Sequence, residues 1–231
     1  MFHGLTQMSR ASDSTEPCDP RLFSQLFPGS VGVAASWLSD EFLPLFPEEA
    51  QAIGNAIAKR RIEFATGRHC ARLAMAQLCH PACGIPSGPD RAPVWPSGLV
   101  GSITHSTDLC AAVVARNDSF RTVGIDTESI NAIPADLVEN ILRPDEADEL
   151  DPHTRPGGAD RLTLYFCLKE AAYKAFYPTC RRIIGFQDMR VRVDPEARRF
   201  LAEIPGLSGS GIPIFQGSYL VRHGRVYAAS W

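Results

Sequence analysis

"LVGSITHSTDLCAAVVARNDSFRTVGIDTES" (residues 99–129) predicts three consecutive β-strands and, with them, the class of the fold. The runs 99–105, 109–116 and 123–129 are rich in the aliphatic and β-branched residues that strands favour. Short polar segments separate the runs, and strands joined in this way pair with their neighbours in antiparallel sheets. We therefore expect a small sheet at the centre of the chain.

Long helices are predicted on both sides of this stretch, at residues 47–78 and 159–177, because apolar residues recur there at helical spacing. Gly54 is expected to divide the first helix into two. Asp160 is a suitable N-cap for the second helix, and Pro178 is expected to end it.

Further strands are predicted at residues 31–38, 189–194 and 198–204 and in a hairpin over 214–231. The order of helix, strands, helix and strands is typical of an α+β fold and suggests two similar halves. We place the N-terminal half at residues 29–118 and the C-terminal half at 119–231. Residues 1–28 are expected to form a polar tail that can be disordered.

Composition limits the classes of function. The chain has 231 residues and a formal net charge of -3, which does not fit a general nucleic-acid binder. The sequence has no apolar run of about 18 residues and no signal-peptide pattern at its start. Its seven cysteines are scattered, which indicates reduced thiols and a cytoplasmic location. Cys79, His80 and Cys83 lack a second ligand pair, so ordinary helix-end residues are favoured over a zinc site.

Asp126 and Glu128 lie two residues apart at the end of a predicted strand and would project from the same face. Carboxylates held this close repel each other unless a positive group lies beside them. Taken alone, the pair is also compatible with a strand end that faces solvent.

Glu170 and Lys174 occupy positions i and i+4 of the second helix and share one face. Such a pair is commonly a surface ion pair of small value, but few polar residues surround this one. Together with Asp126 and Glu128, Glu170 would complete a set of oxygen ligands of the kind that suits Mg²⁺.

Arginines gather in the middle of the first long helix, among them Arg60 and Arg68. Arginine forks match phosphate oxygens, although a solvated basic face is the simpler explanation. Arg91, in the Pro/Gly-rich loop 84–98, can approach the same ligand. In an acidic chain, this local charge favours a small phosphorylated ligand over a polymer. His105 follows Thr104 at a strand end, where a site can open, although a lone histidine is more often structural.

Four segments together resemble the 4′-phosphopantetheinyl transferases, in particular the bacterial branch that activates siderophore, nonribosomal-peptide and polyketide synthases. They are "RRIEFATGRHCARLAM", "RAPVWPSGLVGSITHS", "VGIDTES" and "FCLKEAAYKAF". The resemblance covers about residues 30–190 and depends on the combination of motifs, since none is specific alone. It implies two pseudo-symmetric halves, each a small antiparallel sheet packed on a long helix, with the active site at their interface.

The implied reaction is the Mg²⁺-dependent transfer of 4′-phosphopantetheine from coenzyme A to a serine of an acyl or peptidyl carrier protein, which releases adenosine 3′,5′-bisphosphate. The resemblance assigns metal binding to Asp126, Glu128 and Glu170 and catalysis to Glu170, Lys174 and His105. The residues expected to contact coenzyme A are Arg60, Arg68, Gly88, Arg91, Thr104, His105 and Lys174.

Two departures from the family pattern stand out. Ser106, Thr107 and Asp108 replace the Cys, small residue and Gly that often follow Thr-His, and the loop before Arg91 lacks a lysine that some relatives carry. A coenzyme A-binding protein with a degenerate site and a different Mg²⁺-dependent phosphohydrolase are the alternatives. We expect no nucleic-acid or membrane partner, a monomer, and a carrier-protein docking surface within residues 130–158.

Overall fold

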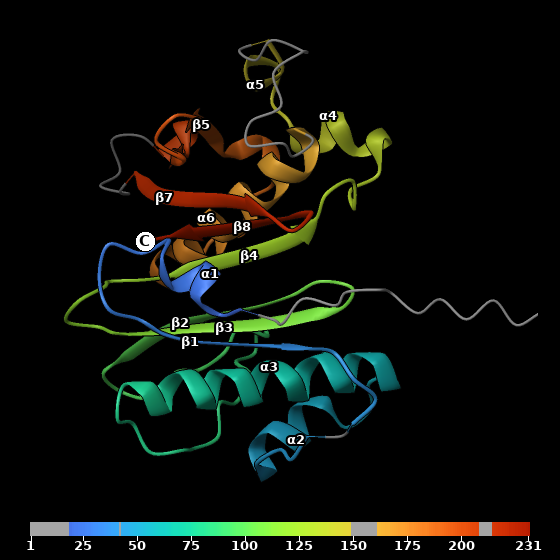
Figure 1. Ribbon diagram of the computed structural model, residues 1–231, viewed down its shortest axis with the longest axis vertical. Helices are drawn as coiled ribbons and strands as arrows, with labels where there is room; N and C mark the ends of the chain where they lie inside the picture. The colour runs from blue at the N-terminus through green and yellow to red at the C-terminus, as the bar shows by residue number, and fades with distance from the viewer. Residues whose placement is uncertain (1–18, 42, 149–160, 208–213) are drawn as a thin grey trace, which may run out of the picture.

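Two antiparallel sheets lie at the centre of the computed structural model (Figure 1), which describes residues 19–41, 43–148, 161–207 and 214–231. One sheet has the strand order β1-β3-β2 and the other has the order β4-β8-β7-β6-β5. The α+β class and the division into two halves are thereby confirmed.

The strands are β1 (Gly32–Trp37), β2 (Leu99–His105), β3 (Leu109–Arg116), β4 (Gly124–Ser129), β5 (Arg190–Asp194), β6 (Arg199–Glu203), β7 (Phe215–Arg222) and β8 (Arg225–Ser230). The helices are α1 (Arg21–Ser24), α2 (Pro47–Ile53), α3 (Ala58–Gln77), α4 (Val138–Ile141), α5 (Pro144–Asp148) and α6 (Arg161–Cys180), with short 3-10 turns at Ala135–Leu137, Phe186–Asp188 and Pro205–Leu207.

Strand β3 is an almost continuous apolar run because both of its faces are buried. Leu109 and Val113 point toward the second sheet, while Val114 packs toward α3 and Cys110 Sγ donates to Glu63 O in that helix. Strands covered on one side only would alternate apolar and polar residues instead. The run therefore marks the middle strand of a sheet that is enclosed between a helix and another sheet.

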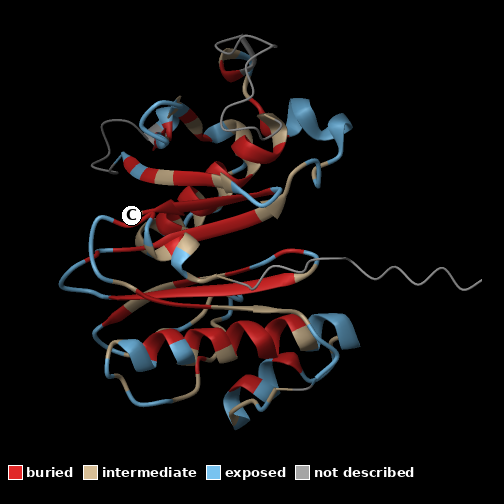
Figure 2. Ribbon diagram, in the orientation of Figure 1, coloured by how far each residue is buried: buried red, intermediate tan, exposed pale blue. Residues whose placement is uncertain are grey.

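The molecule consequently has four layers: α3, the three-stranded sheet, the five-stranded sheet and α6 (Figure 1). Separate apolar cores lie between the two sheets and between each sheet and its helix. Figure 2 shows this burial as red along most of the central strands and in parts of the long helices. No helix in the described ranges is long and apolar enough to cross a membrane.

In each half, a strand glycine lies against the backbone of the long helix. Gly32 of β1 lies directly against the carbonyl oxygen of Ala74 in α3, and Gly124 of β4 lies in the same way against that of Ala171 in α6. A Cβ at either glycine would overlap the helix backbone. Each 20-residue helix therefore approaches its sheet closely through a glycine near the start of a strand.

The structure differs from the sequence prediction in two places. Within the predicted tail, residues 21–24 form α1, and Phe23 of this helix is buried between the sheets together with Leu26 and Phe27, which follow it. Helix α6 also continues past Pro178 to Cys180. A proline in the last turn removes only one intrahelical hydrogen bond, so the helix continues for two residues beyond it. Asp160, the predicted N-cap, lies outside the described residues.

Gly124→Ala tests the close approach of α6 to β4. The added methyl group must displace the helix backbone, so we expect the free energy of unfolding to fall by about 2–3 kcal/mol. Chemical denaturation measures this loss. Gly54→Ala is the matched control, because the nearest atom to its added Cβ is 3.8 Å away. The control should keep or slightly raise stability. Equal stability of Gly124→Ala and the unaltered chain would contradict the packing described here.

Candidate active site

The edge strands of the two sheets lie side by side, β2 from the N-terminal half and β4 from the C-terminal half. Helix α6 packs on β4 from one side, and α3 packs on β2 from the other. Thr104 and His105 end β2, Asp126 and Glu128 belong to β4, and Lys174 belongs to α6. Residues predicted for one site from distant parts of the sequence therefore meet at this junction.

Asp126 is the centre of the group. Its Oδ1 accepts hydrogen bonds from Lys174 Nζ at 2.7 Å and from Thr104 Oγ1 at 2.8 Å, while Lys174 Nζ also lies 3.2 Å from Thr104 Oγ1. Asp126 is buried, and about a quarter of the Lys174 side chain is exposed. Burial disfavours the ammonium group of Lys174, but Asp126 and Glu170 outweigh this effect and raise its pKa. Lys174 is therefore a permanent cation that joins α6, β4 and β2.

The two neighbouring carboxylates are disposed to take up protons. Burial and the charge of Asp126 raise the pKa of Glu128 to about 7, although Arg225 and Lys174 oppose the shift. Burial also raises the pKa of Glu170. Asp126 adds to that shift, and Lys174 opposes it. Asp126 thus repels both Glu128 and Glu170 across a partly buried space, and the sequence predicted the repulsion between Asp126 and Glu128.

The carboxylate oxygens of Asp126, Glu128 and Glu170 are donors of the type that divalent cations bind. Asp126 Oδ2 is buried and has no hydrogen-bond partner in the part of the chain that the structure describes, so one oxygen remains available to a ligand. The side chains are not gathered as ligands, however: the described residues include no group of three or more His, Cys, Asp or Glu arranged to hold a metal ion. Oxygen donors of this kind suit Mg²⁺.

His105 points to the opposite side of β2 from Thr104 and meets α3. Its Nε2 lies 3.0 Å from Arg60 Nη1 and 3.9 Å from a carboxylate oxygen of Glu63. Arg60 in turn approaches Glu63 at 3.4 Å. Burial lowers the pKa of His105, which favours an imidazole that accepts a hydrogen bond from Arg60. These residues form a small polar cluster at the N-terminal end of α3.

Arg68 does not point freely toward a ligand. It is buried, its Nε donates to Ile85 O at 2.8 Å, and its Nη2 donates to Ser87 Oγ at 3.1 Å. Burial lowers its pKa to about 10, so it still carries a proton at neutral pH. Arg68 therefore fastens the loop 84–98 onto α3.

The tip of that loop carries Gly88 and Arg91. Arg91 is exposed, has a φ of 66°, and donates its backbone N–H to Gly88 O at 2.9 Å. Between them, Asp90 accepts hydrogen bonds from Tyr177 Oη at 2.9 Å and from Arg181 Nη1 at 2.7 Å. The loop therefore extends from the N-terminal half to the C-terminal end of α6.

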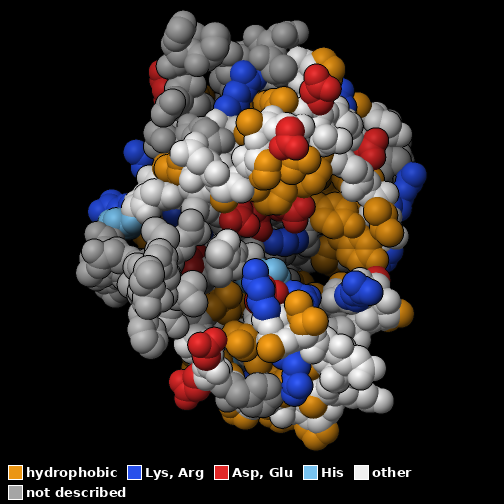
Figure 3. Space-filling view, turned by 90° about the vertical axis from the view of Figure 1, so that its right-hand side faces the viewer, with side chains coloured by type: hydrophobic (Ala, Val, Ile, Leu, Met, Phe, Trp, Pro, Cys, Tyr) orange, Lys and Arg blue, Asp and Glu red, His pale blue; other side chains and the backbone are white. Residues whose placement is uncertain are grey.

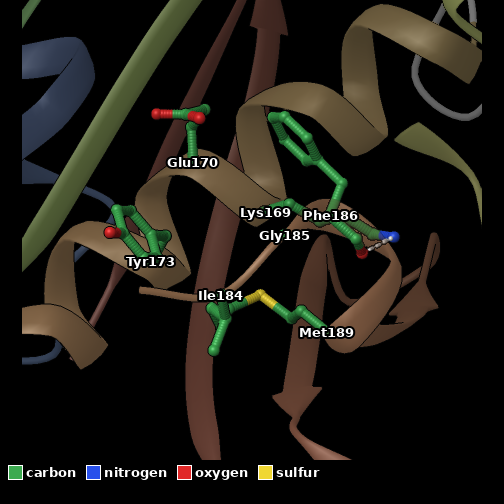
Figure 4. A pocket seen from close by; sticks show the side chains of 7 residues that line it. All are labelled: Lys169, Glu170, Tyr173, Ile184, Gly185, Phe186 and Met189. Atoms are coloured by element: carbon green, nitrogen blue, oxygen red, sulfur yellow. Dashed lines mark hydrogen bonds between the residues drawn. The ribbon is translucent and has the colours of Figure 1, made fainter. Parts of the chain in front are cut away.

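A pocket of about 210 Å³ opens beside Glu170 (Figure 4). Its walls are largely apolar and come from α6 and the segment 184–189. The lining residues are Lys169, Glu170, Tyr173, Ile184, Gly185, Phe186 and Met189. Buried Lys169 holds the far wall, because its Nζ donates to Phe186 O at 2.9 Å and pairs with Glu146 at 2.7 Å.

The space-filling view shows where charged side chains gather on this face. In Figure 3, acidic, basic and histidine side chains lie together in a hollow at mid-height, with hydrophobic side chains above and below. A hollow with both signs of charge and an apolar margin can hold a ligand that has a charged end and an apolar part.

Sequence reasoning missed Arg225, which lies near Glu128 and is 5% exposed. Its sequence signal is weak, because the sequence shows it only as part of the predicted hairpin over 214–231, and the complete burial of the strand that it begins is visible only in the structure. Glu63, three residues after Arg60 on the same helix, pairs with Arg60 and lies close to His105.

Comparisons with known proteins cover both halves. The model of the 4′-phosphopantetheinyl transferase N-terminal domain matches residues 48–115, and that of the 4′-phosphopantetheinyl transferase superfamily matches residues 122–220. The chain is 39% identical over 191 residues to the 4′-phosphopantetheinyl transferase PptT of Mycobacterium tuberculosis, covering 79% of this chain and 84% of that protein.

Two further relatives extend the comparison. The 4′-phosphopantetheinyl transferase Npt of Nocardia iowensis is 34% identical over 220 residues, which cover 90% of this chain and 98% of that protein. Enterobactin synthase component D of Escherichia coli is 36% identical over 134 residues, which cover 56% of this chain and 60% of that protein.

Glu128→Gln tests the electrostatics of the site. Because the folded-state pKa of Glu128 lies above its ordinary value of 4.5, its ionisation destabilises the fold as the pH rises through about 7. We expect the variant to have a higher Tm than the unaltered chain at about pH 8 in a metal-free buffer, and the difference to vanish below about pH 4.5. Thermal denaturation across this range measures the effect.

Glu203→Gln is the control for this experiment, because Glu203 pairs with Arg192 in the outer part of the five-stranded sheet. It should not gain stability at high pH. A Glu128→Gln protein less stable than the unaltered chain at high pH would contradict the repulsion among the carboxylates.

Proposed function

The chain belongs to the 4′-phosphopantetheinyl transferase superfamily, and we propose that it transfers 4′-phosphopantetheine from coenzyme A to a serine of an acyl or peptidyl carrier protein, with Mg²⁺ dependence and release of adenosine 3′,5′-bisphosphate. It is a transferase of the holo-carrier-protein synthase type. The observation that carries the detailed proposal is the contact of Lys174 with Asp126 and Thr104 at the junction of the halves.

This position suits a ligand that extends across both halves. Coenzyme A carries a 3′-phosphate and a pyrophosphate, which need several separate cations. The cluster of Arg60 and His105 lies on the α3 side of β2, and Lys174 lies on the α6 side. We assign the pyrophosphate to the Lys174 side of the junction and the 3′-phosphate to the His105 side.

The remaining predicted contacts belong to the loop 84–98. Gly88 and Arg91 lie at its exposed tip, and Arg68 holds its base. In this proposal Arg91 reaches the ligand directly. Arg68 contributes its positive charge and holds the loop in place.

Asp126, Glu128 and Glu170 would hold Mg²⁺, which supplies neutralisation of the pyrophosphate charge when it is bound. Lys174 has a raised pKa, so it keeps its proton and acts as a fixed positive charge for the leaving phosphate. This favours charge neutralisation over proton donation as its role.

Glu170 is the proposed general base. Its raised pKa improves its match to a serine proton, and it lies on the α6 face that carries Lys174. Glu170 takes the proton from the serine hydroxyl as the serine oxygen bonds to the β-phosphorus of coenzyme A. The bond from that phosphorus to the bridging oxygen breaks, and adenosine 3′,5′-bisphosphate leaves with the electron pair.

The pocket beside Glu170 offers an apolar surface next to the reacting atoms, and we propose that the pantetheine arm enters it. Because carrier proteins are usually acidic, a basic or apolar docking surface is expected. The segment 130–158, between β4 and α6 in the sequence, is acidic in net charge but exposes Leu137 and Val138, which favours an apolar contact. We propose this segment as the docking surface, including residues 149–158, which lie outside the described residues. One chain holds both halves, so we propose a monomer. The free cysteines support a cytoplasmic location in this proposal.

Incubation of an apo carrier protein with the enzyme, coenzyme A and Mg²⁺ tests the proposed reaction. We expect a mass gain of roughly 340 Da on the carrier, the size of one transferred arm. Lys174→Met should reduce the rate by at least about a hundredfold, because it removes the fixed charge and leaves Asp126 unpaired. Intact-mass spectrometry gives both results. No gain with any of several carriers would favour a binding protein over an enzyme.

Glu170→Gln tests whether Glu170 acts as the general base or only as a metal ligand. If Glu170 removes the serine proton, kcat should fall about a hundredfold or more even at saturating Mg²⁺. A role in metal binding alone predicts that excess Mg²⁺ restores kcat. Single-turnover rates at increasing Mg²⁺ measure the difference. Full transfer with unchanged Mg²⁺ dependence would exclude both roles for Glu170.

A further inference from the structure

Four polar side chains recur at alternate positions along β2 and the turn after it. They are Ser102, Thr104, Ser106 and Asp108, and we call them the seam residues. Alternate residues of a strand point to one face, so Ser102 and Thr104 share the side of β2 that meets the C-terminal half, and Ser106 and Asp108 in the turn contact Arg225 of that half. Ser102 Oγ accepts a hydrogen bond from Ile125 N at 3.1 Å, and Thr104 donates to Asp126.

The last two seam residues bind Arg225 of β8. Arg225 Nη1 donates to Ser106 Oγ at 2.7 Å, and Nη2 donates to Asp108 Oδ1 at 2.6 Å. The guanidinium carbon also lies 5.9 Å from the centroid of the Trp37 ring. Only 6% of the Arg225 side chain is exposed, so its bond to buried Ser106 is shielded from water, while Asp108 is partly exposed.

The turn held by Arg225 directly follows the residues proposed to contact coenzyme A. The backbone pairing of β2 with β3 ends at His105, opposite Cys110. Beyond it, the backbone of the turn is held, among the described residues, by hydrogen bonds from Ser106 N to Leu109 O at 2.8 Å and from Leu38 N to Asp108 O at 2.6 Å. Neither of these bonds connects the turn to the C-terminal half. Arg225 makes that connection.

We propose that Arg225, acting through Ser106 and Asp108, is a positioning residue that fixes Thr104 and His105 for coenzyme A. This inference rests on the proposed function. It gives a role to the Ser-Thr-Asp sequence at residues 106–108, which departs from the family pattern. Arg225 need not touch the ligand, because its bonds set the location of the strand end that does.

The proposal predicts a specific kinetic pattern. Glu170 and Lys174 lie on α6, which packs on β4, and the shorter contact of Lys174 is with Asp126 of β4 and not with Thr104 of β2. Loosening the turn should therefore weaken coenzyme A binding and leave the catalytic step nearly intact. KM for coenzyme A should rise while kcat changes little, a split that a general loss of folding would not produce.

Asp108→Asn is the deciding variant, because it loosens the turn and keeps the Arg225 charge near Glu128. Arg225→Gln is the second test variant, and Arg192→Gln is the matched control, because Arg192 pairs with Glu203 in the outer part of the sheet. We expect both test variants to raise KM for coenzyme A and its Kd in titration calorimetry roughly tenfold. The control should leave both values unchanged. Asp108→Glu, which keeps the carboxylate, should lie closer to the unaltered enzyme than Asp108→Asn. The partly exposed Asp108 remains testable even if Arg225→Gln fails to fold.

Calorimetry without a carrier protein distinguishes a failure of the positioning role from a failure of the proposed function. If the unaltered chain binds coenzyme A and the folded test variants bind it equally well, the positioning role is overturned and the proposed function stands. A fall in kcat at unchanged KM would also overturn the positioning role. If the unaltered chain does not bind coenzyme A, the proposed function fails, and this inference fails with it.

Discussion

Two carboxylates on one face of a partly buried strand each require a positive charge nearby, and this constraint organises the junction of the halves. Asp126 meets Lys174, which is possible because Gly124 lets α6 approach β4 closely. Glu128 lies in the field of Arg225, which the pairing of β8 with β4 brings alongside. The two cations come from different elements. The acidic pair therefore ties a helix and a neighbouring strand to the edge of the sheet, and the fold and the site depend on the same charges.

Much of the fold was predictable because long stretches of the sequence carry the apolar patterns that are typical of strands and helices. β2, β3 and β4 fall where the sequence predicted them, and the first long helix divides at Gly54 as expected. The failures came from short or ambiguous signals. Phe23 and its neighbours supply too few apolar residues in a polar segment to reveal a helix, yet they fill the space between two sheets. Pro178 is a reliable stop signal in a helix interior, but in a last turn it costs only one bond.

The site was predictable where its members share a local period. The i, i+4 spacing of Glu170 and Lys174 and the i, i+2 spacing of Asp126 and Glu128 each imply a common face. Which charge meets which cannot be read locally, since the Lys174 contact with Asp126 joins positions 48 apart in the chain. Sequence reasoning expected a metal ion to balance the acidic pair. The structure supplies part of that balance from its own side chains, while Asp126 Oδ2 remains without a partner among the described residues.

The base of the loop 84–98 bears on the thermodynamics of ligand recognition. Arg68 holds Ile85 and Ser87, and Glu49 accepts the N–H of Ile85 at 2.8 Å. These bonds restrict the loop during folding, when the conformational entropy of its backbone is lost. A ligand that meets the loop later finds it preorganised and loses less entropy on association. Residues buried beneath the loop can thus govern affinity without contacting the ligand, through the freedom that they remove from the unliganded protein.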